Sequence, residues 1–208
     1  MLPLIQFDVK ESDLLFNTEL FPLKRQVNQK IYILFEQIKL KLKDTEQHKQ
    51  FIFPTGTDSE TGKISQGENY LSFPWVMLDF PKLFNKEDIF SFRTLFWYGH
   101  YFSFSLVLGG ISAEIYLPLI LKNRDYLKNM GLYFSIHEDP WQHEINAENS
   151  QLLEQTDDLS IEKQVLEHGF VKITRKIQSF DTEEISKNVE EMYVSMLKTL
   201  SGSTNSDH

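Results

Sequence analysis

The chain has 208 residues, a formal net charge of −9 and no cysteine. The acidic charge disfavours nucleic acid as a partner, and the lack of cysteine excludes disulfides, thiolate nucleophiles and zinc sites with Cys ligands. The N-terminus has neither a basic segment nor an unbroken apolar run, and no later run is long enough for a transmembrane segment, so we expect a cytoplasmic protein.

The first elements are predicted to be a long helix and a polar loop. Over residues 23–43, apolar residues recur at helical spacing among six basic residues, which indicates a helix with a solvated basic face or a face that docks on an anionic surface. Residues 51–70 are expected to form a short strand and then a mobile loop, because Thr, Gly, Asp and Ser cluster there without an apolar period. Pro74 and Pro81 then favour an edge strand or a turn over a helix.

The clearest strand pattern lies in residues 90–110. Apolar or aromatic side chains occupy even positions from Phe90 to Leu108, and a period of two is typical of a strand. Single strands seldom exceed about 10 residues. The pattern therefore predicts two strands joined by a tight turn at Tyr98 and Gly99, with the second strand ending at the Gly109-Gly110 pair.

The second half of the chain alternates between helices and strands. Residues 112–130 indicate a helix whose core begins near Leu117, because Pro118 is tolerated only in the first helical turn. A strand over 132–136, a short helix closed by Gly169, a strand over 170–177 and a helix over 181–200 follow. The tail, residues 201–208, is expected to be disordered.

Together these elements predict an α+β fold. We expect a single globular domain over residues 1–200, because the length suits one core and no linker or internal repeat divides the chain. Its sheet should be mainly antiparallel, with about four to six strands packed with three long helices, near residues 23–43, 117–130 and 181–200.

The segment FRTLFWYGHYF resembles a family. Its Phe, Trp, His and Phe pattern, together with the order of the elements, is similar to that of the uncharacterised YktB-like family. The matching positions here are Phe92, Trp97, His100 and Phe102. The chain departs from that pattern in the Gly109-Gly110 pair and in the long polar loop before Tyr70. The resemblance implies a fold and assigns no functional residue, because no activity is established for that family.

The stretch SIHEDPWQHE, residues 135–144, combines two histidines with three carboxylates. An extended strand would point His137 and Asp139 to one face, and a turn at Pro140 would allow His143 to fold back toward them. These side chains could bind a metal ion, but they do not make a complete ligand set and they adjoin an acidic segment. We therefore favour a polar turn without a cofactor.

His100 suggests an enzymatic alternative. The period of two places it on the same strand face as Phe102, where it could act as a general base in a pocket walled by Trp97 and Trp75. Arg93 would then bind an anionic substrate. The favoured interpretation is a structural histidine, hydrogen-bonded across the sheet. The chain carries no phosphate-binding loop, nucleophile elbow or HExxH motif.

The sequence favours a non-enzymatic protein that binds a small molecule or another protein through an aromatic-rich sheet surface. Odd positions near the hairpin turn are bulky as well, so either helices cover both faces of the sheet or one face is a binding surface, of which a homodimer interface would be one form. An enzyme acting on a small anionic molecule is the alternative. The candidate binding residues are Trp75, Arg93, Trp97, Tyr98, His100 and Tyr101.

Overall fold

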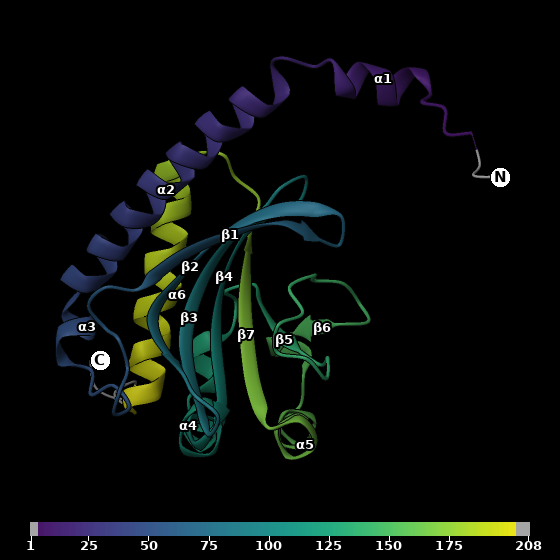
Figure 1. Ribbon diagram of the computed structural model, residues 1–208. Helices are drawn as coiled ribbons and strands as arrows, with labels where there is room; N and C mark the ends of the chain where they lie inside the picture. The colour runs from purple at the N-terminus through teal and green to yellow at the C-terminus, as the bar shows by residue number, and fades with distance from the viewer. Residues whose placement is uncertain (1–3, 203–208) are drawn as a thin grey trace.

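The computed structural model describes residues 4–202 and contains one seven-stranded antiparallel sheet in the order β1-β2-β3-β4-β7-β5-β6 (Figure 1). The predicted α+β class and antiparallel sheet are confirmed, but the sheet has more strands than expected, and residues 4–202 form six α-helices where three long ones were expected. The strands are β1 (Lys63–Tyr70), β2 (Phe73–Phe84), β3 (Asp88–Trp97), β4 (Tyr101–Gly110), β5 (Leu132–Ser135), β6 (Ser150–Leu152) and β7 (Phe170–Ile177).

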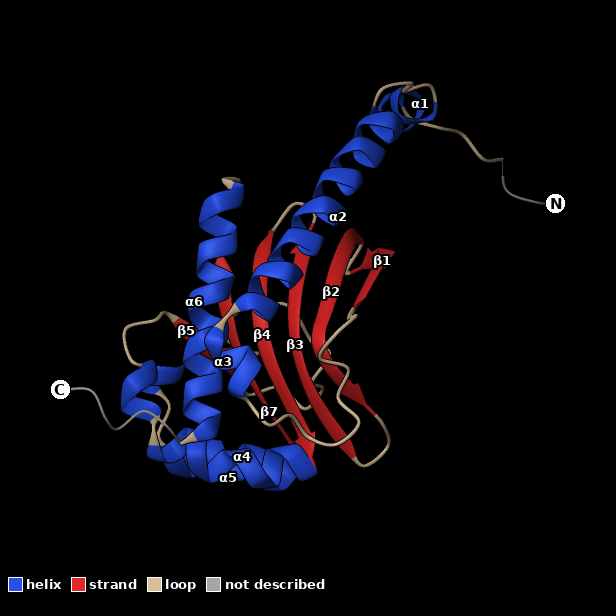
Figure 2. Cartoon of the chain, turned by 90° about the vertical axis from the view of Figure 1, so that its left-hand side faces the viewer, coloured by secondary structure: helices blue, strands red, loops and turns tan. Residues whose placement is uncertain are grey.

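The helices lie on one face and at one end of the sheet. Figure 2 shows α2 and α6 on one face with α3 beside them, while α4 and α5 lie at one end of the strands. The α-helices are α1 (Val9–Leu15), α2 (Leu20–Asp44), α3 (Glu46–Gln50), α4 (Ile111–Lys122), α5 (Asp158–His168) and α6 (Thr182–Ser201). Within residues 4–202, none of them combines the length and apolarity that crossing a membrane would require.

The main core lies between the sheet and helices α2 and α6. Phe92 of β3 and Phe104 of β4 stack with their ring centroids 5.7 Å apart, and Tyr193 of α6 meets Phe92 at 4.7 Å. Even positions of β3 and β4 thus supply the helix-facing side, as the period of two predicts. The predicted turn is also present, because β3 and β4 pair from Asp88 to Gly110 around residues 98–100.

The prolines of β2 correct one prediction. β2 is an interior strand that pairs with both β1 and β3, although Pro74 and Pro81 favour an edge or a turn. Pro81 lies where the register between β2 and β3 shifts, between Asp79 and Lys82, so the irregularity accommodates a residue that cannot donate to the ladder. The short strand predicted at the start of residues 51–70 is absent, and the end of the predicted mobile loop forms β1, Lys63–Tyr70.

The start of helix α4 corrects a second prediction. The helix begins at Ile111, not near Leu117, so Pro118 lies inside it. The Asp88 carboxylate accepts a hydrogen bond of 2.8 Å from the Ser112 backbone N–H, which satisfies one of the free donors at the helix start. The helix therefore continues through Pro118 despite the one helical hydrogen bond that this residue removes. Of the predicted tail, Ser201 ends α6, and residues 203–208 lie outside the described residues.

We expect Pro118→Ala to raise the free energy of unfolding by about 1–2 kcal/mol, because alanine restores a helical donor at an exposed position. Urea denaturation measures the change, with Lys122→Ala in the same helix as the control. A loss of stability in the Pro118 variant would contradict the placement of this residue inside α4.

Candidate functional site

The face of the sheet turned away from α2 and α6 carries a row of polar side chains. Asp79, Arg93, Ser105 and Thr174 are direct cross-strand neighbours on β2, β3, β4 and β7. All four are buried. A half-buried strand normally turns such residues to solvent, so their burial requires another part of the chain to cover this face.

Arg93 and Asp79 form a buried ion pair at one end of this polar row. The guanidinium donates through Nε to Oδ1 of Asp79 at 2.7 Å and through Nη2 to Oδ2 at 3.1 Å, which is a bidentate arrangement. The Trp141 ring lies 4.7 Å from the guanidinium carbon, within the range of a cation–π interaction. The charge of Arg93 is therefore already compensated within the chain.

Residues 136–149, the covering loop, close the face above the polar row. Two tyrosine hydroxyls hold its backbone: Tyr70 accepts from the His143 N–H at 2.7 Å, and Tyr101 donates to the His143 carbonyl oxygen at 3.1 Å and accepts from the Ile145 N–H at 2.9 Å. Burial raises the pKa of Tyr101 to about 12, so its hydroxyl keeps the proton that it donates.

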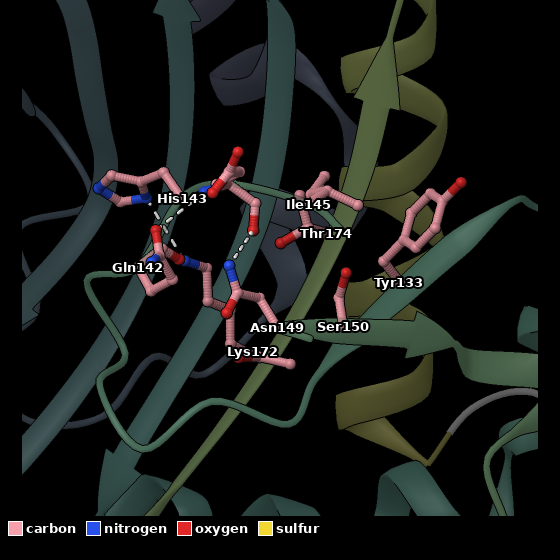
Figure 3. Close-up of a pocket in the computed structure, with 10 residues that line it drawn as sticks. Tyr133, Gln142, His143, Ile145, Asn149, Ser150, Lys172 and Thr174 are labelled. Carbon is pink, nitrogen blue, oxygen red and sulfur yellow. Dashed lines mark hydrogen bonds between the residues drawn. The ribbon is translucent and has the colours of Figure 1, made fainter. Parts of the chain in front are cut away.

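Lys172 of β7 points into the covering loop. The residue is 3% exposed, and its Nζ contacts the carbonyl oxygen of Pro140 at 3.0 Å. It also contacts the carbonyl oxygen of Gln142 (Figure 3). Within residues 4–202 it has no carboxylate at ion-pair distance. Burial, and secondly the positive charge of Arg93, lower its pKa from 10.5 to about 7.

The His143 ring lies between the two basic side chains. Its Nε2 is 3.5 Å from Nη1 of Arg93, and its Nδ1 is 3.3 Å from Nζ of Lys172. Burial is the main cause that lowers the pKa of His143 well below 6.5, and the charges of Lys172 and Arg93 add to it. The imidazole is therefore neutral at pH 7.

The tautomer of His143 decides the protonation of Lys172. With the ring proton on Nδ1, Nε2 accepts from Arg93, and Lys172 accepts the ring proton as a neutral amine. With the ring proton on Nε2, Lys172 is an ammonium whose three donors face Nδ1 and two carbonyl oxygens, but Nε2–H then meets the guanidinium. The first arrangement gives every donor in the cluster an acceptor.

The covering loop and the face beneath it have opposite charges. The face beneath the loop carries the basic side chains of Arg93, Lys172 and Lys176 and the carboxylate of Asp79. The loop contains four carboxylates and no lysine or arginine: Glu138, Asp139, Glu144 and Glu148. Without the loop, this face would be the natural place for an anion on a chain that is acidic overall.

A small pocket opens between the covering loop and strands β5 to β7. Figure 3 shows Lys172 pointing toward Gln142 and His143, while Tyr133 and Ser150 lie on the far side. The pocket has room for about one water molecule. In this closed form, a larger ligand requires the loop to move. Its polar lining consists of Tyr133, Ser135, Gln142, His143, Glu144, Asn149, Ser150, Lys172 and Thr174.

The candidate binding residues from the sequence fall into three places. Trp97 and Tyr101 are almost fully buried and pack with the partly buried Trp75 in a small cluster beneath Tyr70 and Ile145. This cluster lies on the loop-covered face, so the loop and β1, not helices, bury it. Tyr98 points the other way and donates to Asn28 of α2 at 2.6 Å.

The structure separates His100 from Arg93. His100 is exposed in the hairpin turn and stacks on Trp97 with centroids 3.5 Å apart. Arg93 lies four residues before Trp97, about 13 Å along the strand. The pair proposed as general base and anion binder therefore does not meet in one pocket.

The three metal-ligand candidates do not converge either. His137 accepts from the Asp139 N–H at 2.9 Å, the Asp139 carboxylate accepts from the Trp141 N–H at 2.8 Å, and His143 faces two basic side chains. Among residues 4–202, no group of three or more His, Cys, Asp or Glu side chains is placed to hold a metal ion.

Sequence reasoning missed Lys172 and Asp79. The strand FVKITRKI places Lys172, Thr174 and Lys176 on one face, and a polar face on an inner strand is the signal that would have pointed to this site. Asp79 carried no comparable signal, because it follows an apolar run and its partner Arg93 lies fourteen residues later.

We expect Asp79→Ala to lower the free energy of unfolding by about 3–5 kcal/mol, because it leaves Arg93 buried without a carboxylate. Urea denaturation measures the loss. The matched control is the double variant Asp79→Leu with Arg93→Met, which removes both charges and should cost clearly less. A double variant as unstable as the single one would show that the ion pair is not what the site depends on.

Lys172 predicts a pH dependence. Between its folded pKa of about 7 and its ordinary value of 10.5, the unfolded chain binds more protons than the folded chain, so the free energy of unfolding rises with pH across this window. Lys172→Met removes this contribution. We expect its stability relative to the parent to be highest near pH 7 and to decline toward about pH 9.5, measured by urea denaturation. If the free energies of unfolding of Lys172→Met and of the parent changed with pH in parallel, the lowered pKa of Lys172 would be refuted. Lys176→Met is the control.

Comparison of the chain with models of known protein families and with curated proteins found no match. The resemblance to the YktB-like family stays a prediction. Functional assignment therefore rests on the geometry of the loop-covered face.

Proposed function

We propose that the chain is a small-ligand-binding protein that takes an anion on the loop-covered face of its sheet, between Arg93 and Lys172. The anion binds when the covering loop, residues 136–149, moves aside. Of the binding residues predicted from sequence, Arg93 lies in this site, and Trp75, Trp97 and Tyr101 lie farther along the same face.

The proposal rests on the polar contacts that the covering loop makes with Lys172 and Arg93. Two carbonyl oxygens and one imidazole nitrogen occupy the hydrogen-bonding positions of Lys172 and Arg93. The oxygens of a phosphate or a carboxylate would occupy the same positions with a full negative charge, which makes charge-assisted and shorter hydrogen bonds. The loop thus stands in for an anion.

Charge supports an anion over a neutral ligand. A buried lysine without a carboxylate is costly, and an anion would compensate its positive charge. An anion next to Lys172 also favours the ammonium form, so its binding takes up a proton when the amine is neutral beforehand.

The surroundings favour a ligand with an apolar part. Trp141 covers the guanidinium of Arg93, and the cluster of Trp75, Trp97 and Tyr101 lies farther along the same face. A pocket with a few convergent polar groups and an aromatic wall is typical of small-molecule sites. An enzyme that uses His100 as a base receives no support, because His100 lies in the exposed turn.

The test is thermal unfolding with increasing inorganic phosphate, against sodium chloride at equal ionic strength. We expect phosphate to raise the melting temperature of the parent chain, and more strongly at about pH 6 than at pH 8, because binding is linked to protonation of Lys172. Lys172→Met should lose the phosphate-specific shift. Lys176→Met, on the same strand and face, is the matched control and should retain most of it.

Hydrogen exchange gives the second readout. Phosphate should speed amide exchange in residues 136–149 and leave the central strands protected, because the anion displaces the loop. Equal effects of phosphate and chloride, or a phosphate shift that survives in Lys172→Met, would overturn the proposal.

A further inference from the structure

The first turn of α2, residues 20–23, extends beyond the sheet. From Ile31 onward, the inward stripe of α2 is buried: Ile31, Leu34, Phe35, Ile38 and Leu42. The same stripe continues backward at Val27, Leu23 and Leu20, at spacings of three and four residues. Val27 is partly buried and packs against the core, whereas Leu20 is 43% exposed and Leu23 is 58% exposed. The sequence thus builds a packing face that the fold leaves uncovered.

The segment before α2 adds to this apolar surface. Helix α1 has no buried residue, and Figures 1 and 2 show it projecting away from the sheet with the start of α2. Single exposed apolar residues are ordinary, but a contiguous group of this size marks an interaction surface. We call residues 4–30 the overhang. Its exposed large apolar residues are Leu4, Ile5, Phe7, Val9, Leu14, Leu15, Phe16, Leu20, Phe21 and Leu23.

The same end of the sheet is apolar as well. Leu71 and Phe73 at the tip of the β1–β2 hairpin are 52% and 41% exposed. This tip is tied to the overhang, because Lys24 pairs with Glu68 of β1. A molecule that packed under the start of α2 would therefore meet the hairpin tip too.

Two charged residues flank the uncovered stripe without ion-pair partners. Glu19 and Lys30 are exposed, and neither forms an ion pair within residues 4–202, whereas Lys24 between them does. Eleven residues separate the two, which is about three helical turns, so they lie on the same flank of the helix.

We propose that the overhang binds a second copy of the chain. The two copies of α2 pack antiparallel through Leu20 and Leu23, about a two-fold axis near Lys24 and Arg25. Antiparallel packing brings like flanks of two helices together, so Glu19 of each copy faces Lys30 of the other. A two-fold interface must be self-complementary, and a stripe with an acid at one end and a base at the other on one flank has that property.

The residues of this surface are exposed, so substitutions here leave the core intact. The chain has no cysteine, so disulfides do not contribute to association. Sedimentation velocity of the full chain over a concentration series should show a dimer. Leu23→Asp should weaken association at least about tenfold, as expected for an anchor at the centre of an interface. Leu166→Asp is the matched control, because Leu166 is 87% exposed on α5, and it should leave association unchanged.

Charge reversal tests the pairing itself. Glu19→Lys and Lys30→Glu should each weaken the homodimer, because each creates two like-charge contacts per dimer. An equimolar mixture of the two variants should restore association as a heterodimer, since both contacts become attractive. Lys122→Glu, an equal charge change on α4, should have no effect. A parent chain that stays monomeric up to about 200 μM, a dimer indifferent to Leu23→Asp, or a mixture no stronger than its components would each overturn the proposal.

Discussion

The covering loop depends on one constraint: Arg93 and Lys172 are buried on one sheet face with a single carboxylate, Asp79. Taking a charge out of water costs several kcal/mol unless another charge or a set of hydrogen bonds replaces the water. Asp79 compensates Arg93 directly. For Lys172 the chain uses carbonyl oxygens and His143, and the cost is lowest when the amine gives up its proton. The position of residues 136–149 follows from this need.

Much of the fold, but little of the site, was predictable from sequence, because the site joins segments that are distant in the chain. The β3–β4 hairpin and α6 follow from local patterns, namely alternating aromatics around Gly99 and a capped amphipathic helix after Asp181. The site joins β2, β3 and β7 with a loop, and no local pattern reports which strands become neighbours. His143 looked like part of a polar turn, and only the pairing of β4 with β7 places it beside Lys172.

Local rules failed where a distant residue supplied the missing stabilisation. Pro118 argues for a helix start near Leu117, yet α4 begins at Ile111, where Asp88 of β3 accepts from the Ser112 N–H. Pro81 argues for an edge strand, yet the shift in register after Asp79 leaves β2 inside the sheet. In both cases one hydrogen bond is lost locally, and long-range packing of the surrounding apolar residues outweighs it.

The two proposals meet at the β1–β2 hairpin. Tyr70, at the end of β1, holds the covering loop through the backbone N–H of His143, and the next residues form the exposed hairpin tip beneath the overhang. Leu71 and Ser72 in this tip have positive φ angles of 49° and 70°, which non-glycine residues adopt at a cost. A second copy packed on the overhang would touch the tip and restrict it. Because the same hairpin anchors the loop, restricting the tip favours the closed loop, and ligand binding and self-association would then oppose each other through Tyr70.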